Sequence, residues 1–424
     1  MDLKQHLQKL ECHFTWNLDC SKNELKVLLR VLEDVDQKTC TWILHYYNLL
    51  GYIQHALGSN TEALKNLHEA ESVMQEKETE ESGVRLQVNK ANLAWIYFLM
   101  RDMDKSKEYL EEVKRLQRMH PAPPGCTLHP EVSGEKGWTL LKFNKYKKHQ
   151  ATYFCFKMAL AAEPERKEWH KGLAIAMSKA YGHQNCSPEQ KEEIQKQLKI
   201  VHENEPDHLL LHALYLLYLP SDDTESEMQG LLEKTLETGD LECLGIILRY
   251  FRTISVDKAI REAERAREKF PNSSRVLKHL ANCNKREVYK IKEDTVERRR
   301  LAKKSCKLFE EVVSHYPDSL GEKVALASMH HYANNNERAN EIYQQLVSDI
   351  DDFPPHSQQY IYYSYAHFLH HSGKPGSIKF HIKVVKIPVN TPDRRNSIQV
   401  LENLVREGKS PLCEEILDVL KATD

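Results

Sequence analysis

Residues 47–71 read YNLLGYIQHALGSNTEALKNLHEAE, and this stretch decides the fold. Its small side chains, Gly51, Ala63 and Ala70, recur at fixed distances from the large side chain of Leu67. The spacing is that of positions 8, 20, 27 and 24 in a 34-residue helix–turn–helix unit, where small residues let two helices approach closely. The stretch therefore predicts one helical hairpin of the tetratricopeptide type.

The same pattern returns along the chain. Further windows carry it at Ala94, Tyr97, Ser106 and Leu110; Phe156, Ala159 and Pro164; Ala259, Ala263, Ala266 and Pro271; Ser305, Phe309 and Pro317; Ala327, Ala339, Tyr343 and Leu346; and Ser377 with Val384. The distances between successive windows are uneven, which indicates insertions of a few residues up to about a dozen. We therefore predict an all-α fold, an irregular tetratricopeptide-repeat superhelix with a concave groove.

Composition and breaks in the pattern agree with this fold. Only 15 glycines and 16 prolines occur in 424 residues, which favours long helices over turn-rich β folds. Proline-rich or polar breaks occur at 121–124, at 186–188 and at 351–355. They suggest an N-terminal array over 1–130, a central array with a basic groove over 131–355, and C-terminal repeat and capping helices over 356–424.

Charge is balanced overall but separated locally. The chain has 60 basic and 62 acidic residues, a formal net charge of -2, so any nucleic-acid site must be a local patch. Residues 138–149 read WTLLKFNKYKKH, with four lysines and no acid, and residues 275–304 carry eleven basic residues against four acidic ones. Aromatic side chains stand among these cations, an arrangement that can stack a base while the cations hold phosphate. The alternative is a set of ordinary solvated helix faces.

The motifs of common catalytic sites are absent from the sequence. There is no GxxxxGK(S/T) phosphate loop, no GxSxG elbow, no GxGxxG fingerprint and no HExxH. His367 and His371 are four residues apart, a metal-compatible spacing, but we expect surface or core histidines there because no Cys or carboxylate ligand accompanies them. The sequence therefore predicts a protein that is not an enzyme and has no cofactor or metal.

The cellular compartment is predicted from what the chain lacks. Its longest apolar stretch, residues 208–220, is too short to cross a membrane. The ten cysteines form no CxxC pair, and no secretion signal precedes them. We expect reduced thiols, a cytoplasmic location and no membrane partner.

Two strings carry a family resemblance. Residues 10–18 read LECHFTWNL, and residues 137–143 read GWTLLKF. They resemble the interferon-induced proteins with tetratricopeptide repeats, the IFIT family, and the similarity extends from about residue 8 to about residue 390. The resemblance implies a cytoplasmic innate antiviral protein that binds the 5′ end of foreign single-stranded RNA, either triphosphate or incompletely methylated cap, and blocks its translation. It also implies partners among other family members and host proteins.

The resemblance implies that five residues bind the RNA 5′ end. Lys142, Lys179 and Arg30 would neutralise the 5′ phosphates, while Trp138 and Ile175 would sandwich the terminal base. Lys179 stands where the family has an arginine, so the positive charge is kept and the bidentate hydrogen bonding to phosphate is lost.

Five more residues would contact the strand further along. Arg249, Lys278 and Lys323 would follow the RNA backbone, with Tyr250 and His279 beside them. The Lys278–His279 pair replaces a His-Gln pair of the family, and Lys323 lies where an aromatic residue is expected.

One departure from the family weakens the RNA hypothesis. Asp34 falls where the family has a glutamine, and a carboxylate beside phosphates is repulsive. The competing hypothesis is a tetratricopeptide scaffold of the interferon response that binds proteins rather than RNA.

Overall fold

The computed structural model describes residues 2–18, 20–33, 43–75, 82–143, 149–181, 187–407 and 412–422. Over these ranges the chain is helical and has no β-strand. The helices up to residue 238 are α1 (Leu3–Leu7), α2 (Lys22–Glu33), α3 (Ile43–Ala56), α4 (Asn60–Gln75), α5 (Ser82–Leu99), α6 (Met103–Met119), α7 (Pro130–Phe143), α8 (His149–Ala162), α9 (Lys167–Tyr181), α10 (Pro188–Asn204), α11 (Leu209–Tyr218) and α12 (Thr224–Thr238). They are followed by α13 (Leu244–Ile254), α14 (Val256–Lys269), α15 (Ser274–Lys290), α16 (Val296–His315), α17 (Leu320–Tyr332), α18 (Asn336–Ser348), a 3-10 turn (Ile350–Asp352), α19 (Pro355–His371), α20 (Ser377–Lys386), α21 (Pro392–Glu407) and α22 (Cys413–Lys421).

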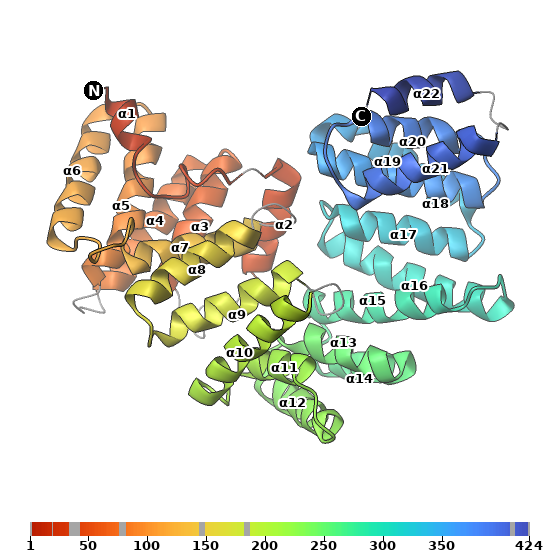
Figure 1. The fold of residues 1–424 in the computed structure, drawn as a ribbon, viewed down its shortest axis with the longest axis horizontal. Coiled ribbons are helices and arrows are strands. Elements are labelled where there is room, and N and C mark those ends of the chain that lie inside the picture. Colours follow the sequence, from red (N-terminus) through yellow and green to blue (C-terminus); the bar gives the residue numbers. More distant parts are fainter. Residues whose placement is uncertain are drawn as a thin grey trace. The chain divides into compact units, whose positions relative to one another are not determined.

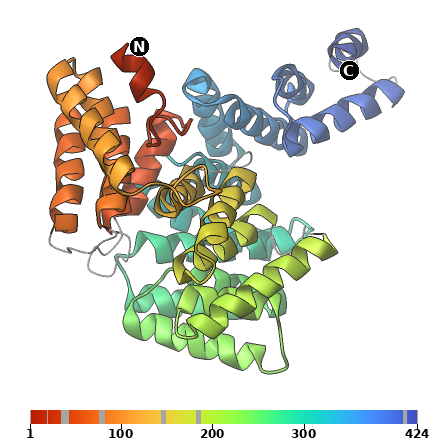
Figure 2. The same ribbon diagram turned by 60° about the vertical axis from the view of Figure 1, so that its left-hand side comes forward.

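The chain divides into two compact units, residues 1–247 and 248–424, and the division falls within α13. In the first unit, hairpins form between α3 and α4, α5 and α6, α7 and α8, α9 and α10, and α11 and α12 (Figures 1 and 2). The leading helices α3, α5, α7, α9 and α11 also contact one another in succession and form one layer. The three arrays suggested by the proline-rich breaks remain a prediction about repeat organisation.

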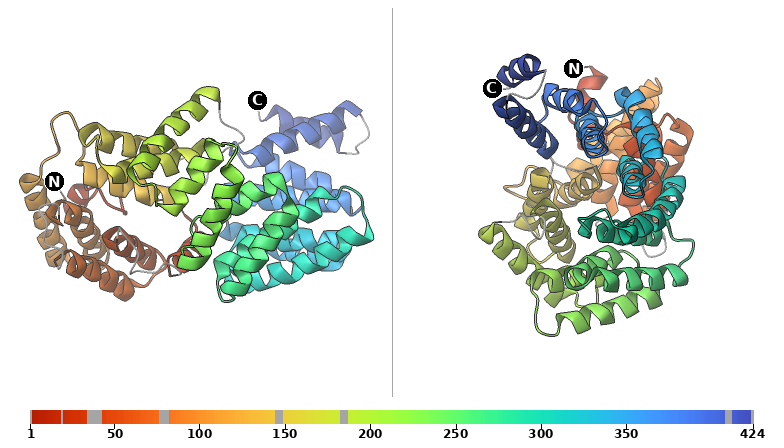
Figure 3. Two further views of the ribbon diagram at one scale, coloured as in Figure 1. Left: turned by 90° about the horizontal axis from the view of Figure 1, so that it is seen from below. Right: turned by 90° about the vertical axis from the view of Figure 1, so that its right-hand side faces the viewer.

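The second unit repeats this plan. Hairpins form between α15 and α16, α17 and α18, and α19 and α20, while α15, α17, α19 and α21 contact one another in succession. Figure 3 shows this stacking of antiparallel pairs from two directions. The all-α tetratricopeptide-repeat fold predicted from the sequence is therefore confirmed.

The small residues of the repeat lie where two helices touch. A Cβ atom on Gly51 would lie 2.6 Å from Cγ of Leu67, so no larger side chain fits opposite that leucine. Ser106 is fully buried and donates a hydrogen bond from its hydroxyl to the Ala94 carbonyl oxygen at 2.9 Å. These contacts explain why the pattern at positions 8, 20 and 24 is a reliable signal of the fold.

Within the described residues, no helix is long and apolar enough to span a bilayer. The apolar stretch at 208–220 forms the short helix α11, most of whose leucines are buried. The eight cysteines in the described part of the chain are all free thiols. Burial raises the pKa of the Cys243 and Cys283 thiols to about 11, which keeps both protonated and unreactive.

Candidate nucleic-acid interface

Four of the predicted RNA-contacting residues lie on two adjacent helices of the first unit. Trp138 and Lys142 are four residues apart on α7, and Ile175 and Lys179 are four residues apart on α9. Residues at this spacing share one helix face. Since α7 packs against α9, each helix contributes one apolar side chain and, a turn later, one lysine.

The two lysines are close enough to influence each other. Both are exposed at the surface. The surrounding protein, together with the Lys142 ammonium, lowers the pKa of Lys179 to about 8, although Glu242 acts in the opposite direction. Among the described residues neither lysine forms an ion pair or a hydrogen bond with a carboxylate. Two like charges are therefore neighbours that no ion pair neutralises, although Glu242 offsets part of their repulsion, and a bound anion stabilises such an arrangement.

Trp138 and Ile175, the two apolar side chains beside the lysines, are half-buried. The Trp138 ring meets Phe156 edge-on, with 5.2 Å between ring centroids. Phe156 itself is completely buried. Trp138 therefore packs in the hairpin core on one side and remains partly accessible on the other.

Arg30 lies on α2 and is half-buried. Its helix packs on α3. Asp34 and the lysines at 145, 147 and 148 lie outside the described residues, so the expected repulsion from Asp34 stays a prediction.

The N-terminal string LECHFTWNL holds α7 in place. The His13 backbone N–H donates to Asn92 Oδ1 at 3.1 Å, and the His13 ring Nε2 lies 3.2 Å from the Thr139 hydroxyl of α7. The Lys136 ammonium, also on α7, pairs with Glu11 at 2.8 Å. The family-like N-terminus therefore positions the helix that bears Trp138, which gives the string a structural role in the candidate site.

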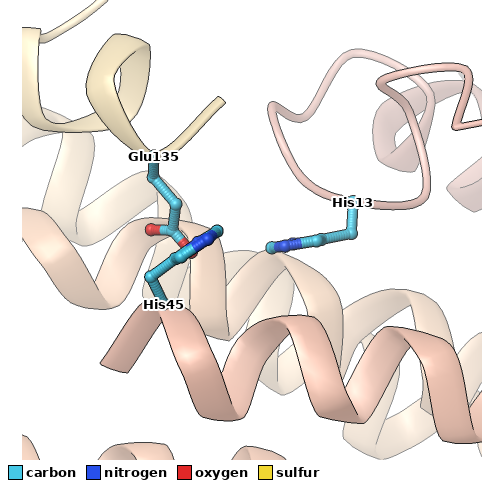
Figure 4. Close-up of side chains that lie close together, drawn as sticks. All are labelled: His13, His45 and Glu135. Carbon is cyan, nitrogen blue, oxygen red and sulfur yellow. The ribbon is translucent and has the colours of Figure 1, made fainter. Parts of the chain in front are cut away.

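Three buried side chains of the metal-ligand type come together where α7 meets α3 and the N-terminal string, with their ligand atoms within 4.8 Å of one another (Figure 4). They are His13, His45 of α3 and Glu135 of α7. His45 Nδ1 lies 3.9 Å from Glu135 Oε1, and Asn48 donates to the same carboxylate oxygen at 2.8 Å. The second ring nitrogen of His13, Nδ1, lies 3.1 Å from the Asn92 amide, so both of its nitrogens have partners. A metal ion bound by His13 or Glu135 would have to displace one of these hydrogen bonds, whereas neither ring nitrogen of His45 has a hydrogen-bond partner among the described residues.

The second unit has a larger cationic group on α13 and α15. Its members are spaced three, four or seven residues apart along each helix, so they share a face. They are Arg249 and Arg252 on α13 and Arg275, Lys278, His279, Lys285 and Arg286 on α15. We call this set the α13–α15 cationic face.

Mutual repulsion and burial change the protonation of this face. Burial and the neighbouring cations lower the pKa of His279 to about 4, so its imidazole is neutral at pH 7. Burial, Arg286 and Arg249 lower the pKa of Arg252. The buried Nε atom of Arg249 has no hydrogen-bond partner among the described residues. A neutral imidazole beside several guanidinium groups can form hydrogen bonds with a phosphate or sugar while the arginines supply the charge.

One predicted phosphate contact is partly neutralised. Lys278 forms an ion pair with Glu322 of α17 at 2.8 Å. Lys323 is the next residue on α17 and is half-buried. Tyr250 is half-buried against Phe251, with ring centroids 5.9 Å apart.

Sequence reasoning missed two members of this surface. Arg252 lies one helical turn after Arg249, and its spacing of three was the available signal. Glu322 was not expected, because its contact with Lys278 joins residues 44 positions apart and no local pattern predicts it.

Stacked helical hairpins with two cationic faces define a tetratricopeptide-repeat protein suited to an anionic ligand. The chain matches no family model. It is 28% identical to the human antiviral innate immune response effector IFIT1 over 421 residues, which cover 95% of this chain and 87% of that protein. It is also 28% identical to human interferon-induced protein with tetratricopeptide repeats 2 over 443 residues, covering 99% of this chain and 91% of that protein.

Solved structures agree with these relatives. Human IFIT1 as a dimer with PPP-AAAA matches with a TM-score of 0.70 at 26% identity, covering 100% of this chain and 95% of that one. The human IFIT1 dimer with m7Gppp-AAAA matches with a TM-score of 0.71 over the same shares. The resemblance to the IFIT proteins predicted from the sequence is thus confirmed along nearly the whole chain.

Proposed function

We propose that this protein binds the 5′ end of foreign single-stranded RNA, triphosphate or incompletely methylated cap, and blocks translation of that RNA as part of an interferon-induced antiviral response. The activity is binding without turnover, and it takes place in the cytoplasm. The relatives named as antiviral effectors, and the human IFIT1 structures with PPP-AAAA and m7Gppp-AAAA, support this function. Other IFIT proteins and host proteins are the expected protein partners.

One observation carries the proposal. The Lys142 ammonium lowers the pKa of Lys179, and neither lysine forms an ion pair with a carboxylate among the described residues. Trp138 and Ile175 stand one helical turn away on the same faces. Folding does not favour two neighbouring like charges without an ion pair, so the arrangement supports an anion site. The adjacent aromatic and aliphatic side chains suit a base attached to that anion.

The test compares three RNAs of one sequence that differ only at the 5′ end: triphosphate, cap and hydroxyl. We expect the triphosphate or the cap to bind at least about tenfold more tightly than the hydroxyl at equal salt, because only these two carry the 5′ phosphate charges. Equal affinity for all three ends would contradict the 5′-end site while leaving general RNA binding intact.

A scaffold function is the second candidate. Phe154 and Met158 are four residues apart on α8, and their side chains are 53% and 36% exposed. An accessible apolar pair on one helix face favours contact with another protein. Failure of all three RNAs to bind would leave this function as the better account.

A further inference from the structure

The histidines on α19 have a geometry that the RNA site does not explain. His367 and His371 are four residues apart on this helix, and both are exposed. Their Nε2 atoms face each other at 3.1 Å, and their ring centroids are 4.2 Å apart. Two imidazoles that meet through the same ring atom bind one shared proton or one metal ion.

The separation of the two nitrogens suits a single ion. Zinc–imidazole bonds are about 2.0–2.1 Å long, so two nitrogens in a tetrahedral zinc site lie ~3.3 Å apart. The observed 3.1 Å differs little from that value. The two nitrogens are therefore already at a separation that one ion can bridge.

We propose that His367 and His371 form a two-histidine site for a divalent transition-metal ion of the zinc and copper class, with water in the remaining positions. Imidazole nitrogen is a preferred ligand for both ions, and an exposed pair leaves room for the other ligands. This proposal differs from the sequence-based expectation of ordinary surface or core histidines at these two positions. The site is separate from the proposed RNA contacts and does not depend on them.

The experiment titrates the full-length, chelator-treated protein with Zn²⁺ against a chromophoric zinc chelator at pH 7.4. We expect His367→Ala and His371→Ala each to lower the affinity of one site by about tenfold or more, since losing even a supporting contact of a metal ligand costs 10–100-fold. The double variant should bind no more weakly than either single variant, because one lost ligand already destroys the chelate.

His370→Ala is the matched control. It removes an exposed histidine next to His371 on the same helix, and its ring meets the His371 ring edge-on with 5.2 Å between ring centroids. We expect zinc affinity to be unchanged in this variant. Circular dichroism and thermal unfolding without metal check that every variant is folded.

Three results would overturn the proposal. These are unchanged zinc affinity in folded His367→Ala, an equal loss in His370→Ala, and independent, additive losses in the double variant. The last result would mean that the two histidines belong to different sites.

Discussion

Charge reversal of Lys142 is the most direct test of the α7–α9 pair. At about 4 Å, an ammonium and a phosphate attract each other by roughly 1 kcal/mol in water and roughly 4 kcal/mol near a protein surface. Lys142 is exposed, so the lower part of this range applies. Lys142→Glu replaces the attraction with a repulsion of similar size, and we expect binding of a 5′-triphosphate RNA to weaken by about 2–4 kcal/mol, or about 30- to 1000-fold.

The assay is equilibrium binding of fluorescent 5′-triphosphate RNA at several salt concentrations. Phosphate contacts carry no base information, so RNAs of different sequence should lose affinity equally. The salt dependence should also fall by about one unit of slope.

Lys107→Glu is the matched control for this test, because Lys107 is exposed on α6 and pairs with Asp104 of the same helix at 3.9 Å. This control should bind like the wild type. If Lys142→Glu and Lys107→Glu bind equally at every salt concentration, the site is wrongly placed.

The remaining predictions concern protonation and packing. Because the pKa of Lys179 is lowered to about 8, RNA affinity should fall between pH 7 and pH 9.5 as its ammonium is lost. In binding titrations, Lys179→Arg should abolish that pH dependence. If the Lys179→Arg variant has the same pH profile as the wild type, the assignment of the pH dependence to Lys179 is wrong. Burial lowers the pKa of His381 to about 4, so between pH 6.5 and pH 4 the unfolded chain binds a proton at this residue and the folded chain does not. The free energy of unfolding should therefore decrease as the pH is lowered through this window, by about 1–2 kcal/mol at pH 5. Urea unfolding of His381→Asn should show a smaller decrease. A Cβ on Gly172 would lie 2.2 Å from Phe156, whereas nothing lies within 4 Å of a Cβ on the exposed helical Gly230. In the same unfolding assay, Gly172→Ala should lower the free energy of unfolding by about 1–3 kcal/mol, and Gly230→Ala should raise it by about 0.5–1 kcal/mol. Equal effects of the two substitutions would contradict this packing.

The fold was predictable because its signal is local. Gly51 and Leu67 are only 16 residues apart and belong to one hairpin, and their contact depends on the size of each side chain. Helix starts could also be recognised locally. Ser187, followed by Pro188, caps α10 and accepts a hydrogen bond from the Gln190 backbone N–H.

The candidate site was only partly predictable. Trp138 and Lys142 are one turn apart on α7, so any helix places them on the same face. Their approach to Lys179 depends on how α7 and α9, which α8 separates in the sequence, pack against each other. The ion pair between Lys278 and Glu322 depends in the same way on the packing of α15 and α17, and it changes the charge available at a predicted phosphate contact.

The sequence by itself determined the helical hairpins, the small residues between them and the faces that carry lysine, arginine and tryptophan. These features follow from periodicity and side-chain size, which act over a few turns of one helix. Only the tertiary structure decided which cations repel one another and which cation a carboxylate neutralises. The physical reason is that these electrostatic energies depend on distances between atoms of different helices, and those distances exist only after the helices have packed.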